Sequence, residues 1–451
     1  MDSVWRLSVD TGGTFTDALA HTPDGRVLRA KVLSSGALRG FIKSGHTPTT
    51  IEVAPVLDVD VLSGGTFHLL QKEHAEAMVV RFDPARSIIE LSNDLGVTLT
   101  PGATFEVRTG KEAPIVAAHL LTRTPMNASL PEISIRLGTT LATNALLTRS
   151  GAETALFITE GFGDLLEIGT QQRPDLFALR VEKPPVVYSH VVEVPERLAA
   201  DGAVLSALAT APLESKVTAL LELGVETAAI ALLHSDKNAA HEQALAAWLT
   251  GRGFKHVSCS SSLAQVIRIV PRAGTAVVNA YLAPVVEGYL RRIKQSLNNK
   301  NLLVMNSAGG LSDSAGSQPK DMLLSGPAGG VVGAARAGKR SGCERIISFD
   351  MGGTSTDVAR YDQDYDYVFE HRVGDAHLFA PALSIETVAA GGGSICGFDG
   401  TGLFVGPASA GASPGPACYG AGGPLTVTDV NLLLGRLDPS RFGIPVNVQP
   451  A

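Results

Sequence analysis

The sequence predicts an α/β protein made of two lobes, each built around a β-hairpin. Three observations support this fold class. An eight-residue motif occurs twice, at residues 10–17 and 350–357, and a short β-rich apolar run precedes each copy. Between the copies, buried β-type runs alternate with helical stretches, which is the pattern of an α/β fold.

The two copies read Asp10-Thr-Gly-Gly-Thr-Phe-Thr-Asp17 and Asp350-Met-Gly-Gly-Thr-Ser-Thr-Asp357, and they match at six of eight positions. In each copy an Asp ends a strand, two glycines permit a turn with open φ, and a Thr/Asp string begins the next strand. Backbone N–H groups in such a turn can hold anionic oxygens, Thr hydroxyls add donors, and Asp can hold a metal directly or through water. One copy would also fit an ordinary structural hairpin, but two copies favour a nucleotide site to which each lobe brings one phosphate loop.

The composition excludes several classes of protein. At 451 residues, with 45% hydrophobic and 18% charged residues, the chain has room for two or three globular domains. A net charge of −7 without a Lys/Arg run argues against nucleic-acid binding. The four cysteines stand singly, which fits a reducing cytoplasm. The N-terminus lacks a signal-peptide pattern, and the best apolar stretch, residues 225–233, is too short to cross a membrane.

After the first hairpin, residues 4–33, the pattern of apolar and polar residues changes. From about residue 34 to 108, short period-2 runs with Gly and Pro breaks predict a small β-rich insertion. Residues 110–121 then read as a helix that returns to the main body, and residues 133–138 read as a strand.

Thr139 and Thr140 follow that strand where a helix begins. Their hydroxyls and the free N–H groups of the helix can receive an anion. Simple capping of the helix explains the same residues, and this stretch favours neither interpretation.

Residues 168–175 form an exposed polar loop with one Arg. The planar guanidinium of Arg173 is suited to a bidentate grip on a substrate carboxylate. An ion pair between Arg173 and Asp175 is the structural alternative.

Helices are predicted at 213–224 and 239–251 around a strand at 226–233, and a long amphipathic helix at 274–297. His234, His241 and Glu242 do not have the spacing of a zinc motif, so a helix start is the better interpretation.

The second half begins with a strand at 301–305 and a small-residue helix from Ser325, whose N-terminus could face phosphate. Residues 333–339 spell G-x-x-x-x-G-K, but Arg340 stands where a P-loop needs Ser or Thr and no strand precedes the glycines, so a P-loop is rejected. The second copy of the motif follows, and then the glycine run Gly391, Gly392 and Gly393.

The chain resembles the hydantoinase A / 5-oxoprolinase family, particularly the fused 5-oxoprolinase type. Besides the two copies of the motif, the matching stretches are Leu137–Leu147, Glu167–Phe177, Arg268–Arg272, Leu324–Gly333, Thr387–Ser394 and Val405–Tyr419. Together they cover most of residues 4–33 and 133–440. The resemblance implies an actin-like ATPase fold, as in sugar kinases, actin and heat-shock chaperones.

The implied activity is ATP-dependent hydrolysis of a cyclic amide, with 5-oxoproline opened to glutamate after phosphoryl transfer to the lactam oxygen. The alternatives within the enzyme class are an N-methylhydantoinase and a subunit of an acetone- or acetophenone-type carboxylase. A non-catalytic ATP-binding module is the alternative from another class.

The resemblance also distributes roles over the motif residues. Asp10, Asp17, Asp350 and Asp357 are expected to be catalytic, with Asp10 and Asp350 on Mg²⁺ or its waters. Contacts to ATP are expected from Gly12, Gly13, Thr14, Thr16, Gly352, Gly353, Thr354, Thr356, Gly391, Gly392 and Gly393. Substrate contacts are expected from Thr139, Thr140, Asn144 and Arg173.

Two domains are expected: an N-terminal hydantoinase/oxoprolinase domain at 1–210, with the insertion at 34–108, and a hydantoinase A core domain at 211–451. Family members continue past this point, so the second lobe is expected to be incomplete, without its adenosine-binding loop. A hydantoinase B-type domain or subunit is the expected partner, and the protein is expected to form a homo-oligomer.

Overall fold

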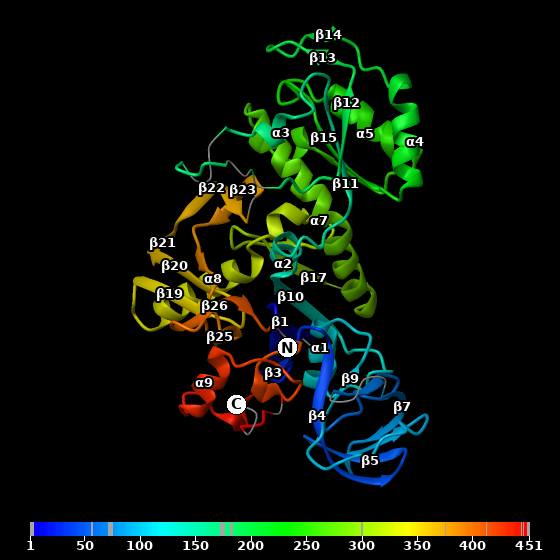
Figure 1. Cartoon of the computed structure of the whole chain (residues 1–451), viewed down its shortest axis with the longest axis vertical. Helices are drawn as coiled ribbons and strands as arrows, with labels where there is room; N and C mark the ends of the chain where they lie inside the picture. The colour runs from blue at the N-terminus through cyan, green and yellow to red at the C-terminus, as the bar shows by residue number, and fades with distance from the viewer. Residues whose placement is uncertain are drawn as a thin grey trace.

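A computed structural model describes residues 4–55, 57–70, 75–171, 176–180, 183, 185–298, 301–374, 376–411, 413–442, 444 and 446–448. The mixture of strands and helices confirms the predicted α/β class. Figure 1 shows an elongated molecule: a parallel-sheet unit lies at one end, a six-stranded sheet lies near the middle, and a small β-barrel projects at the other end beside the C-terminal segment.

The six-stranded sheet has the order β18-β17-β10-β1-β2-β3. Its strands are β1 (Trp5–Thr11), β2 (Phe15–His21), β3 (Val27–Leu33), β10 (Ile133–Thr139), β17 (Leu302–Met305) and β18 (Leu311–Asp313). β10 runs parallel to β1 and β17, whereas β1, β2 and β3 form an antiparallel meander. Side chains alternate between the two faces along each strand, so Leu7 and Leu137 point into a hydrophobic core. Helix α1 (Ala113–Thr122) and helix α7 (Ile269–Ser296) contribute residues to the same core.

The predicted β-rich insertion is a closed six-stranded barrel, β4-β5-β8-β7-β6-β9. Its strands are β4 (Ala37–Thr47), β5 (Thr50–Ala54), β6 (Thr66–Leu69), β7 (Glu76–Asp83), β8 (Ile88–Leu91) and β9 (Thr104–Arg108). The period-2 runs fill its interior with apolar side chains, among them the stacked rings of Phe67 and Phe105, 4.9 Å apart. Closure leaves the barrel without free sheet edges.

A second, parallel sheet has the order β12-β11-β15-β16. Its strands are β12 (His190–Val194), β11 (Thr154–Thr159), β15 (Thr227–Ala231) and β16 (His256–Cys259), with the hairpin β13 (Arg197–Leu198) and β14 (Val204–Ser206) alongside in sequence. β11 and β15 are buried along their whole length because helices cover both faces. Helices α4 (Glu214–Glu222) and α5 (Ala240–Arg252) contribute to one core and α7 to the other. The short helices here are α3 (Leu165–Ile168), α6 (Ser260–Leu263) and η1 (Ala211–Leu213).

Helix α7 joins the two sheets, because it supplies residues to the cores of both. It begins at Ile269, five residues before the predicted start, since Pro271 is tolerated in a first helical turn, where a backbone N–H has no acceptor. Among the described residues α7 is the one helix long and apolar enough to cross a membrane, a candidate that the sequence analysis had not noted. However, 72% of its apolar window is buried inside the protein, as in a core helix.

The second copy of the motif lies in an antiparallel sheet formed by β19 (Arg345–Met351), β20 (Thr356–Asp362), β21 (Asp364–Tyr365) and β24 (Glu386–Val388). Within the described residues β19 pairs only with β20, and its Ile347 and Phe349 side chains are exposed. The surrounding elements are β22 (Tyr367–Val373), β23 (Ala376–Leu383), β25 (Ser394–Phe398), β26 (Leu403–Ser409), α8 (Ser325–Arg340), α9 (Val427–Leu433), η2 (Pro319–Met322), η3 (Ala417–Tyr419) and η4 (Pro439–Arg441).

Candidate functional site

The two copies of the motif fold into hairpins with the same register. Asp10 pairs with Asp17 across β1 and β2, and Asp350 pairs with Asp357 across β19 and β20. The same backbone hydrogen bond closes both turns, from Gly12 N–H to the Phe15 carbonyl at 3.0 Å and from Gly352 N–H to the Ser355 carbonyl at 2.9 Å. Six shared residues at identical spacing have therefore produced two copies of one local structure.

The repeat continues on a third strand in each sheet. Asp17 lies opposite Lys31 of β3, and Asp357 lies opposite Thr387 of β24. The Lys31 ammonium donates to Asp17 at 2.6 Å, whereas the Thr387 hydroxyl donates to Asp357 at 2.7 Å. The two hairpins differ at this position, because only the first has a cation beside its second Asp.

The two turns face each other at close range. A Cβ added to Gly13 would lie 3.5 Å from Thr354 Oγ1, and a Cβ added to Gly353 would lie 2.6 Å from Thr14 Oγ1. The contacts are reciprocal, since the second glycine of each turn meets the threonine of the other. None of the four glycines has a φ in the left-handed region, so backbone conformation does not require them. The facing turn restricts the second glycine of each pair, most tightly Gly353. The expectation that open φ explains the Gly-Gly pairs is wrong.

Burial and the nearby Asp350 raise the pKa of two carboxyl groups at this junction, Asp10 and Asp357. Asp10 keeps some contact with solvent, but the surrounding protein desolvates it and Asp350 lies near, and together they raise the pKa of Asp10 to about 6. Desolvation, followed by Asp350, also raises the pKa of Asp357. Crowded negative charge of this kind is typical of a site that receives a cation.

The junction of β10 and helix α2 (Leu141–Leu147) lies against the first hairpin loop. Thr140 N–H donates to the Thr11 carbonyl at 2.9 Å, and Asn144 Nδ2 donates to Thr140 Oγ1 at 3.2 Å. Asn144 Nδ2 would also lie 3.3 Å from a Cβ on Gly13. Thr139 is fully buried, and its Oγ1 accepts from Leu141 N–H at 3.1 Å. The structure therefore brings Thr139, Thr140 and Asn144 to the loop, although Thr139 acts there as a helix-start residue.

Helix α8 begins beside the same carboxylates. Ser325 Oγ accepts from Thr139 N–H at 3.2 Å, which ties the start of α8 to β10. A Cβ on Gly326 would lie 3.4 Å from Asp10 Oδ1, and one on Gly330 would lie 3.3 Å from Asp350 Oδ2. The small residues of α8 thus let one helix approach both hairpins. A contact between its N-terminus and phosphate stays a prediction.

Several residues expected to contact ATP have partners inside the protein. Gly392 and Gly393 N–H groups donate to the carbonyls of Gly352 and Gly353, at 2.9 and 2.6 Å, and so support the second loop from behind. A Cβ on Gly391 would lie 2.7 Å from the Gly353 carbonyl oxygen.

The threonines after each turn are also occupied. Thr16 Oγ1 shares a hydrogen bond with Ser34 Oγ at 3.1 Å, and Thr356 Oγ1 donates to the Ala390 carbonyl at 2.6 Å. A contact between phosphate and the hydroxyl of Thr16 or Thr356 stays a prediction. To donate to phosphate, each hydroxyl would have to give up its present hydrogen bond.

Arg173, the predicted contact to a substrate carboxylate, lies outside the described residues.

Tyr289 of α7 is a residue near the first hairpin that the sequence did not reveal. Its hydroxyl donates to Thr11 Oγ1 at 3.3 Å, and burial raises its pKa. Only its place in a long amphipathic helix could have drawn attention to Tyr289, and that pattern does not distinguish it from a core residue.

No group of three or more His, Cys, Asp or Glu side chains among the described residues is arranged to hold a metal ion. His241 and Glu242 instead begin helix α5, and Glu242 accepts hydrogen bonds from Ser235 and Ser260. At the hairpins, Asp17 is paired with Lys31 and Asp357 with Thr387, whereas Asp10 lies near Asp350. Two carboxylates suit Mg²⁺, which usually completes its coordination with waters and phosphate oxygens.

The fold and the site define a mixed α/β protein with a duplicated hairpin motif whose two copies meet. The comparison with known sequences then gives the family. Residues 272–449 match the hydantoinase/oxoprolinase model, and residues 104–252 match the model of the hydantoinase/oxoprolinase N-terminal region. The chain belongs to the hydantoinase/oxoprolinase family, as the motifs predicted.

Curated relatives include 5-oxoprolinase 1 of Arabidopsis thaliana, 43% identical over 332 residues, which are 68% of this chain and 26% of the relative. The 5-oxoprolinase of Saccharomyces cerevisiae is 41% identical over 342 residues, again 68% of this chain and 26% of the relative. The chain thus spans about a quarter of the length of these relatives. The caprolactamase subunit alpha of Pseudomonas jessenii is 34% identical over 320 residues, 66% of this chain and 45% of that subunit.

Two solved structures share the fold. The nucleotide-free acetone carboxylase superposes with a TM-score of 0.71 at 21% identity, over 100% of this chain and 58% of that one. The ATP-dependent caprolactamase from Pseudomonas jessenii superposes with a TM-score of 0.61 at 26% identity, over 99% of this chain and 57% of that one.

Proposed function

We propose that this chain is the ATP-binding part of an enzyme that opens a cyclic amide, with 5-oxoproline as substrate and glutamate as product. The meeting of the two hairpins is the observation that carries the proposal. It provides two glycine turns, threonine hydroxyls and paired carboxylates at one place, which is the set of groups that phosphoryl transfer needs.

The same observation supports a two-lobed, actin-like architecture. The first hairpin belongs to a sheet in which β1 pairs with both β2 and the parallel strand β10, whereas the corresponding strand β19 pairs with β20 alone among the described residues. By internal repetition, the edge of β19 that is unpaired among the described residues should accept a parallel strand. We divide the chain into an N-terminal domain at 1–210, which includes the barrel, and a core domain at 211–451.

The chemistry follows from the poor reactivity of an amide. The lactam carbonyl oxygen attacks the γ-phosphorus of ATP, the bond to the β-phosphate oxygen breaks, and ADP leaves. One water adds to the activated carbonyl carbon and gives a tetrahedral intermediate that carries hydroxyl, phosphate and nitrogen. The C–N bond then breaks, the proton of the added hydroxyl passes to the nitrogen, and an amino group and an acyl phosphate are left. A second water attacks the acyl phosphate and releases phosphate, so that the products are glutamate, ADP and phosphate.

This chain's residues serve the first step. Gly12, Gly13 and Thr14, with Gly352, Gly353 and Thr354, provide the surface for the phosphates. Asp10 and Asp350 would hold Mg²⁺, which supplies charge neutralisation when bound. Asp17 and Asp357 lie opposite Asp10 and Asp350 across the two hairpins, where they would bind the waters of Mg²⁺ or act as a polarising base. Lys31 and Thr387 hold their carboxylates in place.

Substrate binding is assigned to the β10–α2 junction, with Thr140 and Asn144 beside the first loop. Arg173 is proposed to hold the 5-oxoproline carboxylate through two parallel hydrogen bonds. Hydrolysis of the activated lactam is assigned to a hydantoinase B-type domain or subunit.

A lactam without a carboxylate is the second candidate substrate, because a caprolactamase subunit is 34% identical over two thirds of the chain. ATP hydrolysis measured with 5-oxoproline, N-methylhydantoin, caprolactam or acetone, in the presence of the B-type partner, separates the candidates. Stimulation by 5-oxoproline supports the proposal. Stimulation by another compound alone reassigns the substrate, and no stimulation by any of them favours a non-catalytic ATP-binding module.

A further inference from the structure

The chain that follows the third strand of each sheet passes behind the corresponding hairpin turn. Directly after β3, the Ser34 hydroxyl donates to the Gly12 carbonyl at 2.7 Å. Shortly after β24, the Gly392 N–H donates to the Gly352 carbonyl at 2.9 Å. The two acceptors are equivalent, because each belongs to the peptide that joins the two glycines of its turn.

A donor that holds this carbonyl also sets the direction of the N–H group in the same peptide. A trans peptide is planar, so its N–H points away from its carbonyl oxygen. The Gly13 and Gly353 N–H groups therefore point away from Ser34 and Gly392, and within the described part of the chain neither has a hydrogen-bond acceptor. Free backbone N–H groups in such a turn can bind an anionic oxygen.

A peptide between two glycines needs such an anchor, because neither neighbour has a Cβ that would restrict its rotation. Each turn has a second anchor as well. The Ser34 N–H donates to the Thr14 carbonyl at 3.0 Å, and the Gly393 N–H donates to the Gly353 carbonyl at 2.6 Å. Both turns are therefore held at two carbonyls, and in the first turn a side chain, the Ser34 hydroxyl, provides one of the hydrogen bonds.

The Ser34 hydroxyl is itself held by the motif. Thr16 Oγ1 lies 3.1 Å from Ser34 Oγ, and Thr16 is fully buried. Because Ser34 uses its one hydroxyl hydrogen for Gly12, Thr16 is the donor in this pair. A hydroxyl that accepts one hydrogen bond donates a stronger one, so Thr16 reinforces the contact between Ser34 and Gly12.

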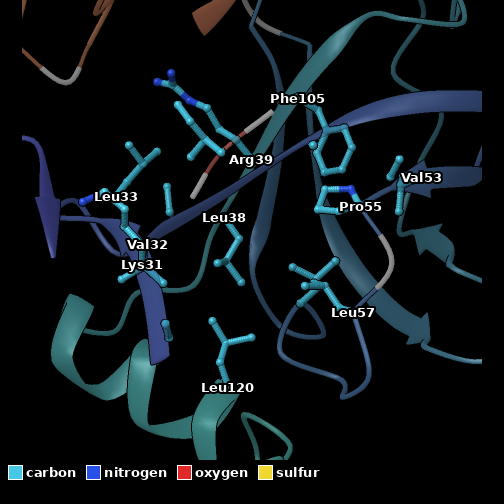
Figure 2. Close-up of a pocket in the computed structure, with 16 residues that line it drawn as sticks. Lys31, Val32, Leu33, Leu38, Arg39, Val53, Pro55, Leu57, Phe105 and Leu120 are labelled. Atoms are coloured by element: carbon cyan, nitrogen blue, oxygen red, sulfur yellow. The ribbon is translucent and has the colours of Figure 1, made fainter. Parts of the chain in front are cut away.

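The turn that carries Ser34 has little freedom to move. It joins β3 to β4, and Figure 2 shows its neighbours Leu33 and Leu38 beside a cavity of about 210 Å³ between the sheet and the barrel. Ser34 is not among the described residues that line this cavity, and its hydroxyl is directed to the hairpin. Gly36 in the same turn has no room for a side chain, since a Cβ there would lie 2.2 Å from the Lys111 carbonyl oxygen.

We propose that Ser34 is a positioning residue for the first phosphate loop. Through the Gly12 carbonyl it holds the peptide whose N–H, on Gly13, donates to a phosphate oxygen of ATP. The inference rests on the proposed function, which makes ATP the ligand of this turn. It adds a residue outside the repeated motif, and loss of the Ser34 hydroxyl should weaken the phosphate contacts alone.

The test compares the affinity for ATP with that for adenosine, which has no phosphate, in the protein with its hydantoinase B-type partner and Mg²⁺. In Ser34→Ala we expect the Kd for ATP to rise about tenfold, the scale of one hydrogen bond, and the Kd for adenosine to change by less than about twofold. Ser35→Ala is the matched control, because Ser35 is exposed and its Oγ only accepts from the Ala37 N–H at 3.3 Å. Both Kd values should stay within about twofold in this control.

Ser34→Cys is a second variant that decides the matter if Ser34→Ala does not fold. It has nearly the same shape, but a thiol is a weaker donor, so it should show a smaller selective loss of ATP affinity. Unchanged ATP affinity in whichever variant folds, or an equal loss of affinity for ATP and adenosine, would overturn the inference and leave the proposed function intact. If the unmodified protein binds ATP no more tightly than adenosine, the proposed function and this inference are both overturned.

Discussion

The close approach of the two hairpin turns leads to a prediction about one methyl group. Gly353→Ala would place a Cβ 2.6 Å from Thr14 Oγ1 and 3.3 Å from Thr14 Cβ, so the turns must separate or Thr14 must leave its position. Thr14 is buried, with 6% of its surface exposed, and therefore has little room to move. Overpacking of this kind costs about 1–3 kcal/mol, and we expect Gly353→Ala to lower the free energy of unfolding by that amount.

Gly352→Ala is the matched control from the same turn. Its added Cβ would lie 3.6 Å from the Ser355 carbonyl oxygen, an ordinary van der Waals distance. Neither glycine has a φ in the left-handed region, so backbone strain does not separate the two variants. We expect Gly352→Ala to change the stability by less than about 0.5 kcal/mol.

Thermal and urea unfolding of both variants, and of the double variant Gly353→Ala/Thr14→Ala, provide the assay. Thr14→Ala removes the oxygen that the new Cβ would meet, so the double variant should lose less stability than the sum of its single variants. Equal stability of Gly353→Ala and Gly352→Ala, or strict additivity in the double variant, would refute the inference that the turns touch.

Three further predictions concern the charge of Asp10, the role of Arg173 in substrate binding and the activity of the isolated chain. Because the folded chain raises the pKa of Asp10 to about 6, it binds that proton more tightly than the unfolded chain, and its stability should fall as the pH rises from about 4 to about 6. Asp10→Asn should therefore stabilise the protein by about 1 kcal/mol at pH ~7.5 and have no effect on stability at pH ~4. The value of about 1 kcal/mol is reduced because Asp10 is in contact with solvent, which screens its charge. Equal effects of the substitution at both pH values would contradict this. Arg173→Lys should weaken 5-oxoproline binding by ~1–3 kcal/mol with ATP affinity nearly unchanged, and an unchanged KM for 5-oxoproline would return Arg173 to a structural role. Because β19 pairs only with β20 in the part of the chain that the structure describes, the isolated 451-residue chain should bind ATP weakly and show no 5-oxoproline-dependent turnover. Steady coupled hydrolysis by the isolated chain would show that the nucleotide site is misplaced.

The repeated motif made much of the site predictable. The motif begins and ends with Asp, and its two glycines mark the turn between two strands. Antiparallel pairing of these strands then sets Asp10 opposite Asp17 and Asp350 opposite Asp357. The sequence also located the strand and helix that carry Thr140 and Asn144, since both have clear apolar periodicity. Local patterns of this kind depend on neighbouring residues only.

Long-range packing was not predictable in the same way. Position 353 needs a glycine because a Cβ there would clash with Thr14, about 340 positions earlier in the chain. No local sequence pattern indicates that contact. Closure of the insertion into a barrel depends on the pairing of β4 with β9, which a list of period-2 runs does not specify. Tyr289 reaches Thr11 only because α7 crosses behind β1, and the sequence of α7 alone marks it as one apolar position among many.

We have proposed that the two hairpins form one ATP site. Its most direct test is ATP turnover with the cyclic amide in Asp10→Ala and Asp357→Ala, made in the protein with its hydantoinase B-type partner. Asp24→Ala and Asp362→Ala are matched controls, because each removes an exposed, ion-paired carboxylate at the far end of one of the two hairpins. If the two hairpins form one ATP site, turnover should fall at least about 10²-fold in Asp10→Ala and in Asp357→Ala, with both controls near the unmodified rate. Near-normal turnover in a well-folded Asp10→Ala or Asp357→Ala variant would contradict it.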